Sequence, residues 1–462
     1  MRLDIHMKSL SFFGLGAGLA LGTAGAQGKG PELPPIRQLG AVSATATEKL
    51  GVITSIRPLS DGRVLVNEPS ARRVLLFDAK LDKFTVVADS TSATANAYGG
   101  RVAGLIGYLA DSTLFVDPQS LSMLVLDPTG KVARVMSVPS AQDAMAFAGA
   151  LGSAGMDRQG RLIYRASPRF DFRGAGPGAA GGPPRMPEMP DSAPIFRIDL
   201  TTRKIDTLAY IKTQKIKMNV TQGENGRVTM TSEINPLPTV DEWAVVSDGS
   251  VALVRGRDYH IDWVNTDGSR ISSPKIPFEW QRLSDEDKVA FIDSVKAARE
   301  RLGANAPVPV TPGGGGAAPA PANAAGGPPP GAGGETRVMV FAGGAGGEGG
   351  AARGGPPGPG GGFNVNAAPP AFVAPSELPD YKPVFLNGFV RADADGNVWI
   401  RTIPTKAIAG GPVYDVVNRK GELVERVQVP VGRTITGFGP GGVVYLTTRD
   451  GLTTKLEKAT VR

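Results

Sequence analysis

The chain contains no cysteine and only two histidines. The absence of cysteine excludes disulfide bonds, thiolate metal sites and thiol nucleophiles. His6 lies close to the first residue, which leaves His260 as the only histidine in the rest of the sequence. A metal site built from several histidines is therefore excluded, and a Ser–His–Asp triad would have to use His260.

Long runs of one charge are absent too. The formal net charge is +7, but lysine and arginine are scattered and form no basic stripe with aromatic residues between them. We therefore expect no nucleic-acid partner; the charge favours solubility, with a weak attraction to anionic envelope polymers as an alternative. The glycine-rich tracts lack the Gly-Lys-Ser/Thr ending of a phosphate loop, and no G-x-S-x-G nucleophile motif occurs.

No apolar run is long enough to cross a bilayer. The first residues instead have the pattern of a secretory signal peptide, with a positive charge at Lys8, a short apolar run at Leu10–Leu21 and small residues at Ala24–Ala26. Met7 is an alternative start. We expect residues 1–26 to be a signal peptide and the mature protein to be soluble and exported, to the periplasm or outside the cell.

The stretch Asp241–Pro277 consists of four short apolar runs separated by turn residues. Its Asp-Gly pairs, at Asp248 and Asp267, are flanked by alternating apolar residues. This pattern is typical of tight hairpins, because glycine tolerates the positive φ that they require. It predicts four antiparallel strands at Trp243–Val246, Ser250–Arg255, Tyr259–Asn265 and Ile271–Ile276.

The same pattern recurs along the chain and predicts a repeat architecture. One such sheet cannot bury both of its faces, so neighbouring sheets must stack, and a ring is the closed solution. We predict an all-β, six-bladed β-propeller of four-stranded antiparallel blades over residues 27–462, with five or seven blades as alternatives. The last unit lacks one strand, which Ile36–Thr47 would supply. The units are Ile53–Val87, Leu105–Val138, a third from Ala146 that resumes at Pro194, Asp241–Pro277, Phe389–Val429, and a sixth from Ile435 to the end.

Three segments depart from the repeat. Residues 172–190 and 304–370 are rich in glycine and proline, and the second is almost entirely Gly, Ala and Pro. Such segments have too little apolar surface to offset the entropy of ordering, so we expect a flexible loop and a disordered insertion. Residues 284–303 are expected to form one inserted helix that lies against the propeller edge.

The predicted helix has recognisable ends. Ser284 is its expected N-cap, acidic residues fill the first turn, and Gly303 ends it. Its expected apolar face consists of Val289, Ile292, Val295 and Leu302, with Phe291 at the border.

The densest polar and aromatic cluster consists of Arg255, Tyr259, His260, Asp262 and Trp263. Strand alternation places Tyr259 and Trp263 on one face, and His260 and Asp262 on the other. His260 and Asp262 could then hydrogen-bond, which would orient the imidazole as a base. Alternatively, His260 and Asp262 satisfy each other's hydrogen-bonding groups between blades, while the two aromatic rings fill the core. No residue nearby supplies a nucleophile.

Trp280, Arg391 and Arg401 are further candidate ligand-binding residues. Trp280 could reach over one mouth of the ring, or it could serve as a hydrophobic staple for the helix. Arg391 and Arg401 flank a hairpin of the fifth unit, and Arg391 could point into the central channel, where arginine would suit an anionic ligand. Solvated channel walls explain these arginines equally well.

Asp393–Asn397 resembles the start of a calcium-binding loop. A complete loop of that kind needs a bidentate glutamate further on and flanking helices, whereas here Trp399 and Ile400 follow in strand alternation. We therefore interpret this segment as a hairpin turn, with calcium binding as the alternative.

The repeats as a whole resemble secreted bacterial six-bladed β-propeller proteins related to the NHL-repeat and TolB-like propellers. The resemblance implies a propeller platform and specifies no chemistry. Relatives that act as lactonases or lyases use metal-bound carboxylates or histidines around the channel mouth, and this sequence shows no matching constellation. The segments that carry the resemblance are Leu59–Glu68, Asp241–Gly268, Ala392–Thr402 and Tyr414–Val427.

These observations favour a monomeric, exported, non-catalytic platform without a cofactor, which binds a small-molecule or glycan ligand or an envelope protein at a channel mouth. One alternative is a calcium-dependent enzyme of the lactonase or lyase kind, with Asp, Glu and Asn ligands in the channel. The other is a purely structural module. No residue is assigned a catalytic or metal-binding role.

Overall fold

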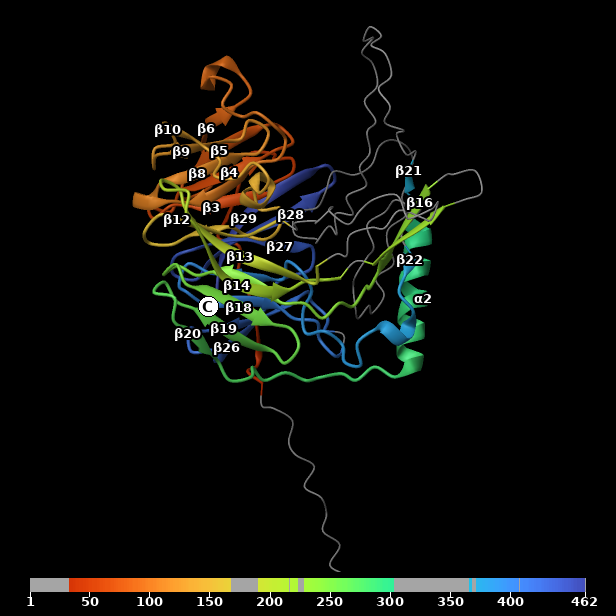
Figure 1. The fold of residues 1–462 in the computed structure, drawn as a ribbon. Helices are drawn as coiled ribbons and strands as arrows, with labels where there is room; N and C mark the ends of the chain where they lie inside the picture. Colours follow the sequence, from red (N-terminus) through yellow and green to blue (C-terminus); the bar gives the residue numbers. More distant parts are fainter. Residues whose placement is uncertain are drawn as a thin grey trace, which may run out of the picture.

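The computed structural model describes residues 33–167, 190–215, 217–222, 228–302, 365–367, 371–406 and 408–461. Within these ranges the chain forms seven β-sheets and two α-helices (Figure 1). No helix in the described part of the chain is long and apolar enough to span a membrane. The predicted signal peptide and nearly all of the two glycine- and proline-rich segments lie outside the described residues.

The first three sheets each contain four antiparallel strands in chain order. Sheet 1 contains β3 (Ser55–Pro58), β4 (Val64–Glu68), β5 (Arg73–Phe77) and β6 (Phe84–Asp89). Sheet 2 contains β7 (Gly104–Gly107), β8 (Thr113–Asp117), β9 (Ser122–Leu126) and β10 (Val132–Ser137). Sheet 3 contains β11 (Gly155–Met156), β12 (Arg161–Arg165), β13 (Ser192–Asp199) and β14 (Ile205–Lys212).

The next three sheets repeat this order. Sheet 4 contains β17 (Glu242–Val245), β18 (Val251–Arg255), β19 (His260–Val264) and β20 (Arg270–Ser272). Sheet 5 contains β23 (Val390–Ala392), β24 (Val398–Arg401), β25 (Val413–Val417) and β26 (Leu423–Gln428). Sheet 6 contains β27 (Arg433–Gly439), β28 (Val443–Asp450) and β29 (Thr453–Thr460).

The turns between strands follow the predicted chemistry. Gly249 has a φ of +86°, and the Asp248 carboxylate accepts the Ser250 N–H at 2.7 Å, which fixes the β17–β18 turn. The β23–β24 turn is built in the same way around Asp393, whose Oδ1 accepts the N–H groups of Asp395 and Asn397. The prediction of a hairpin turn at Asp393–Asn397 is therefore confirmed.

Apolar clusters join the sheets in a cycle. Leu65 packs with Phe115 between sheets 1 and 2, and corresponding clusters lie between each later pair of sheets. The cycle closes between sheets 6 and 1, where Tyr445 packs with Val64 and Val66. The first strands of the sheets are neighbours in the order β27, β3, β7, β11, β17, β23, so they form the inner wall of the ring. This cyclic stacking is the architecture of a β-propeller.

Both ends of the chain close the ring. β2 (Ala44–Thr45) pairs antiparallel with β29 and gives sheet 6 its fourth strand, as predicted for the segment Ile36–Thr47. That segment is not one strand, however, because β1 (Ile36–Gln38) pairs parallel with β26 and adds a fifth strand to sheet 5. The N-terminal segment thus fastens sheets 5 and 6.

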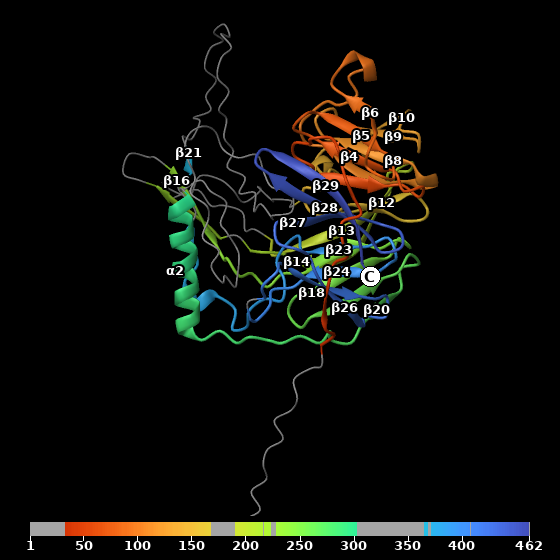
Figure 2. The same cartoon turned by 180° about the vertical axis from the view of Figure 1, so that it is seen from behind.

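A side sheet and the helix α2 (Asp285–Leu302) lie beside the ring (Figures 1 and 2). The sheet contains β15 (Lys217–Gln222), β16 (Val228–Ile234), β21 (Val365–Ala367) and β22 (Ala371–Phe372). Its strands come from the connections that precede and follow sheet 4. One connection runs from β14 to β17 and the other from β20 to β23, so each joins the outermost strand of one sheet to the innermost strand of the next. Both connections therefore leave from the same face of the ring.

The start of α2 agrees with the prediction. The Ser284 hydroxyl accepts the Asp287 N–H at 3.2 Å, and the Asp287 carboxylate accepts the Ser284 N–H at 2.9 Å, which forms a reciprocal cap. The predicted apolar face is wrong at Val289, which is 46% exposed, whereas Lys288 is buried and pairs with Asp380 at 2.7 Å.

The predicted position of α2 against the propeller edge is also wrong. Ile292 packs with Leu237, Val373 and Leu378, in a small core that α2 shares with the segments around the side sheet. Phe291 borders this core, as expected. The side chain of Leu302 lies outside the described set.

Candidate functional site

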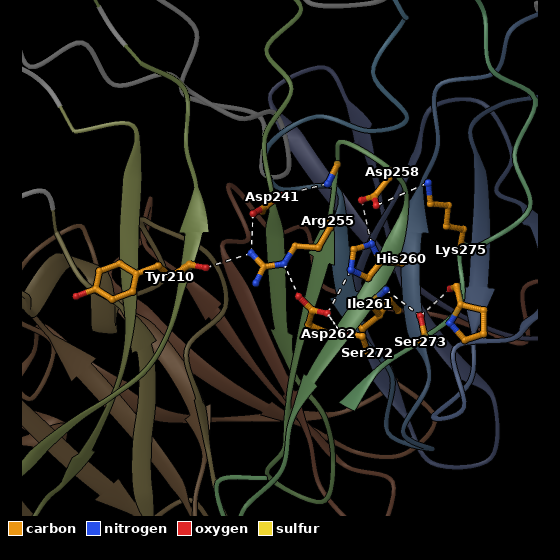
Figure 3. Close-up of polar contacts among 12 residues, drawn as sticks. Tyr210, Asp241, Arg255, Asp258, His260, Ile261, Asp262, Ser272, Ser273 and Lys275 are labelled. Atoms are coloured by element: carbon orange, nitrogen blue, oxygen red, sulfur yellow. Dashed lines mark hydrogen bonds and ion pairs between the residues drawn. The ribbon is translucent and has the colours of Figure 1, made fainter. Parts of the chain in front are cut away.

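His260 lies between two carboxylates at the start of β19 (Figure 3). Its Nδ1 is 3.0 Å from Asp258 Oδ1, and its Nε2 is 3.2 Å from Asp262 Oδ1. The predicted contact between His260 and Asp262 is therefore present. Because each ring nitrogen faces a carboxylate oxygen, neither is left to take a proton from a substrate, and the arrangement does not support a role for His260 as a general base.

Arg255 extends this network toward the neighbouring sheet (Figure 3). Its Nε donates to Asp262 Oδ2 at 2.8 Å, and one terminal nitrogen donates to Asp241 Oδ2 at 2.7 Å. The same nitrogen donates to the carbonyl of Tyr210 in β14, at 3.1 Å. Partial burial would raise the pKa of Asp262, but hydrogen bonds from Ser272 and Arg255 outweigh it and lower that pKa.

The position of Arg255 has a structural role in other sheets. Arg255 ends the second strand of sheet 4, as Glu68 does in sheet 1 and Asp117 in sheet 2. Glu68 accepts the Gly51 N–H at 2.6 Å, and Asp117 accepts the Gly99 N–H at 3.1 Å. In each case the last residue of the second strand holds the segment that enters the same sheet. Arg255 holds the segment before β17 through its ion pair with Asp241, so the network fixes the point where the chain enters sheet 4.

Tyr259 and Trp263 fill the core, in agreement with the alternative interpretation of this cluster. Both rings are buried between sheets 4 and 5. The Tyr259 hydroxyl donates to Asp415 Oδ2 at 2.9 Å, and Arg426 Nε lies 3.3 Å from the other oxygen of Asp415. Burial raises the pKa of Tyr259 well above its ordinary value, which keeps the phenol protonated as a donor.

Trp280 belongs to a row of aromatic side chains that ends at the surface. Its ring lies edge-on to those of Phe278 and Tyr381, with centroid distances of 5.5 and 6.3 Å. Phe278 in turn contacts the buried Tyr259. Trp280 is 40% exposed, so its outer side is available to a partner, while these ring contacts are made with residues outside α2.

Arg391 and Arg401 lie on sheet 5, next to the inner wall. Arg391 is in the innermost strand β23, and the Arg401 guanidinium lies 4.5 Å from the centroid of the Phe389 ring. Both are half-buried, and among the described residues neither has a carboxylate or another oxygen acceptor. Other half-buried arginines, such as Arg73 and Arg433, pair with glutamates at 2.6 Å.

Tyr414 lies on the same sheet as both of these arginines. It is the cross-strand neighbour of Arg401. Burial raises the pKa of its phenol, while the charges of Arg401 and Arg391 act in the opposite direction. Burial also lowers the pKa of Arg391, which no carboxylate offsets. The Arg391–Tyr414–Arg401 group, called the arginine site below, combines two cations with a phenol and has no counter-charge of its own among the described residues.

Glu242 and Arg165 are two further charged residues, and the sequence reasoning missed both. Glu242 begins the inner strand β17, is buried, and accepts the Gly388 N–H at 2.9 Å. Burial raises its pKa to about 7, although the charge of Arg165 acts in the opposite direction. The Nε of Arg165 is buried without a hydrogen-bond partner among the described residues. The sequence did contain a signal for Glu242, because it is a charged residue at the start of an otherwise apolar inner strand.

Two buried carboxyl groups give an expected pH dependence of stability. Burial raises the pKa of Asp415 to about 6, as it raises that of Glu242 to about 7. A carboxyl group whose folded pKa exceeds its unfolded pKa stabilises the fold below the unfolded value, and this stabilisation is lost as pH rises through the folded value. We expect the free energy of unfolding to fall between about pH 4 and pH 7, by on the order of 3 kcal/mol per group.

Chemical denaturation at a series of pH values measures this effect. The Glu242→Gln variant keeps an acceptor for the Gly388 N–H but removes one titration, so its stability should fall less over the same interval. A wild-type free energy of unfolding that stays constant between these pH values would contradict the expectation.

Within the described ranges, no group of three or more His, Cys, Asp or Glu side chains is arranged to hold a metal ion. The carboxylates of the Asp393–Asn397 turn are engaged by backbone donors, since Asp395 accepts the N–H groups of Gly441 and Gly442. These two bonds join the turn of sheet 5 to that of sheet 6.

No protein-family model and no curated protein matches the sequence. Among solved structures, the chain is similar to the calcium-binding protein regucalcin from Agrobacterium tumefaciens, at 10% identity and a TM-score of 0.37, over 92% of this chain and 98% of that one. It is also similar to virginiamycin B lyase from Staphylococcus aureus, at 10% identity and a TM-score of 0.32, over 90% and 99% of the two chains. TolB from Acinetobacter baumannii matches at 10% identity and a TM-score of 0.30, over 91% and 67%.

These TM-scores are below 0.5, so the assignment of the fold rests on the cyclic stacking of the sheets. That stacking defines an all-β protein of the β-propeller class, with a side sheet and a helix attached through the two connections that flank sheet 4.

Proposed function

We propose that the protein is an exported, six-bladed β-propeller that works as a binding platform and holds an anionic ligand at the arginine site. The observation that carries this proposal is the pair of half-buried arginines, Arg391 and Arg401, which have no oxygen acceptor among the described residues. A ligand bound there would lie near the inner end of sheet 5, close to the mouth of the ring.

Charge energetics support an anion rather than a neutral ligand. A cation withdrawn from water loses several kcal/mol of hydration, and a counter-charge in good geometry restores much of it. Guanidinium groups suit this role because their planar N–H donors match the two oxygens of a carboxylate or phosphate. The stacking of Arg401 on Phe389 holds one guanidinium in place, which reduces the entropy lost on binding.

Calorimetric titration of the wild-type protein with inorganic phosphate and with acetate, at low salt, tests the proposal. We expect both anions to bind, and Arg391→Gln and Arg401→Gln each to weaken binding at least tenfold, because a charge-assisted hydrogen bond contributes about 1.5 to 3 kcal/mol. Arg134→Gln, at an exposed arginine on β10, is the matched control and should bind as wild type does. Absence of anion binding by the wild type, or equal binding by all variants, would refute the proposal.

Glu242 favours a second candidate, an enzyme of the lactonase or lyase kind, with calcium dependence as its more specific form. A carboxyl group with a pKa of about 7 can both accept and donate a proton near neutral pH. Glu242 lies on the inner strand β17, where the positive charge of Arg165 favours its ionised form.

Hydrolysis of a simple lactone, followed with calcium and after chelation, tests this second candidate. This second candidate predicts turnover by the wild type and a loss of at least a hundredfold in Glu242→Gln, since a positioned general acid or base contributes about 100- to 10,000-fold. Calcium that binds the folded state should also raise its thermal stability. Turnover that survives in Glu242→Gln would exclude Glu242 as the acid or base.

A further inference from the structure

We infer that the ligand of the arginine site is a carboxylate attached to a flat apolar group, such as an aromatic acid. This inference rests on the proposed anion site and adds the chemical class of its ligand. It is carried by the aromatic side chains beside the two arginines, which have no oxygen acceptor among the described residues.

Aromatic rings adjoin the arginine site on sheet 5 and on sheet 6. Phe389 lies under the Arg401 guanidinium, and Tyr414 is the cross-strand neighbour of Arg401. Trp399 is the cross-strand neighbour of Arg391, and its ring centroid is 6.1 Å from that of Tyr414. Phe438 of β27 brings a further ring to within 4.9 Å of Trp399. Phe389, Tyr414 and Trp399 are therefore direct neighbours of the two cations, and Phe438 extends this aromatic group through its contact with Trp399.

Two of these rings are incompletely covered. Phe389 and Phe438 are half-buried and pack at the margins of the apolar clusters on either side of sheet 5, whereas core aromatics such as Phe115 are fully buried. A flat apolar group in contact with Phe438 would remove apolar surface of both partners from water, which stabilises the complex. Offset or edge-on contact between two rings stabilises the complex further.

The same surroundings disfavour a free, strongly hydrated anion. Phosphate carries up to two charges at neutral pH, and its hydration must be replaced by donors. The arginine site offers two guanidinium groups and one phenol, and the remaining neighbours named above are apolar rings. A carboxylate carries one charge that a single guanidinium pairs in bidentate geometry, and its apolar part can occupy the aromatic side of the site.

Titration of the full-length mature protein with benzoate, acetate and inorganic phosphate tests the inference. We expect the wild type to bind benzoate at least tenfold more tightly than acetate. Phe438→Leu keeps an apolar side chain but removes the ring, so the ratio of benzoate affinity to acetate affinity should fall to less than threefold. Phe84→Leu, at a half-buried ring of sheet 1, is the matched control and should keep the preference.

Each result has one meaning. Equal binding of benzoate and acetate by the wild type would overturn the aromatic ligand class and leave the anion site standing. A preference for benzoate that persists in Phe438→Leu, or that is lost equally in Phe84→Leu, would also overturn it. If none of the three anions binds, the proposed anion site itself falls.

Discussion

Deletion of residues 33–50 is expected to lower the free energy of unfolding by about 5 kcal/mol or more. The deletion removes β1 and β2, so sheet 6 loses its fourth strand and sheet 5 its fifth. It also removes the buried side chains of Leu39 and Leu50, and burial of a leucine contributes about 1.5 to 3 kcal/mol. Leu50, which is fully buried, contributes to the closing contact between sheets 6 and 1.

Urea denaturation followed by circular dichroism measures this loss. Leu50→Ala should account for about 2 to 5 kcal/mol of it. Arg37→Ala, at an exposed residue of β1 whose ion pair with Glu425 lies at the surface, is the control and should change stability by less than about 0.5 kcal/mol. A deletion variant within 1 kcal/mol of the wild type would show that the ring closes without its N-terminal segment.

Replacement of Tyr259 by alanine is expected to destabilise the protein by about 3 to 5 kcal/mol, through the cavity left between sheets 4 and 5. The substitution also leaves Asp415 Oδ2 without the phenol that donates to it. Tyr259→Phe retains the ring and removes only the donor, and we expect it to cost about 1 to 3 kcal/mol.

A double-mutant cycle with Asp415→Asn separates the hydrogen bond from the packing. The coupling between Tyr259→Phe and Asp415→Asn should exceed 0.5 kcal/mol, because the two groups are in direct contact. Tyr210→Phe, at a tyrosine that is 61% exposed, is the control and should be neutral. Additive effects of the two substitutions would mean that the bond contributes nothing to the joint between the sheets.

The ring was predictable from the sequence because its turns are local. Asp248-Gly249 and similar pairs determine hairpins within a few residues. Every unit except the third and the one at Asp241–Pro277 was therefore located to within about two residues of the observed sheet. The side sheet was missed because β15 is rich in polar side chains and its parallel partners β21 and β22 come from a remote segment. The apolar face of α2 was predicted wrongly at Lys288 and Val289 for a related reason. Lys288 is buried and pairs with Asp380, which is distant in the sequence.

The candidate site was predictable only in part. Alternation along β19 correctly paired His260 with Asp262, but it could not show that Asp258 takes the other ring nitrogen. Arg391 and Arg401 were recognisable as arginines beside an inner hairpin. That Arg165 and Glu242 come within electrostatic range of each other depends on how sheets 3 and 4 stack, and no local pattern records that stacking.

The pairing of β2 with β29 also affects how the chain reaches its folded state. The first and last strands of the ring are hydrogen-bonded neighbours, so the contact of greatest sequence separation is the one that completes the fold, and such contacts form slowly. A growing chain carries β2 without its partner until β29 has been made, and the free edge of β29 then offers unpaired backbone groups to any extended segment nearby. The rate of this last closure should therefore set how much of the newly made protein aggregates.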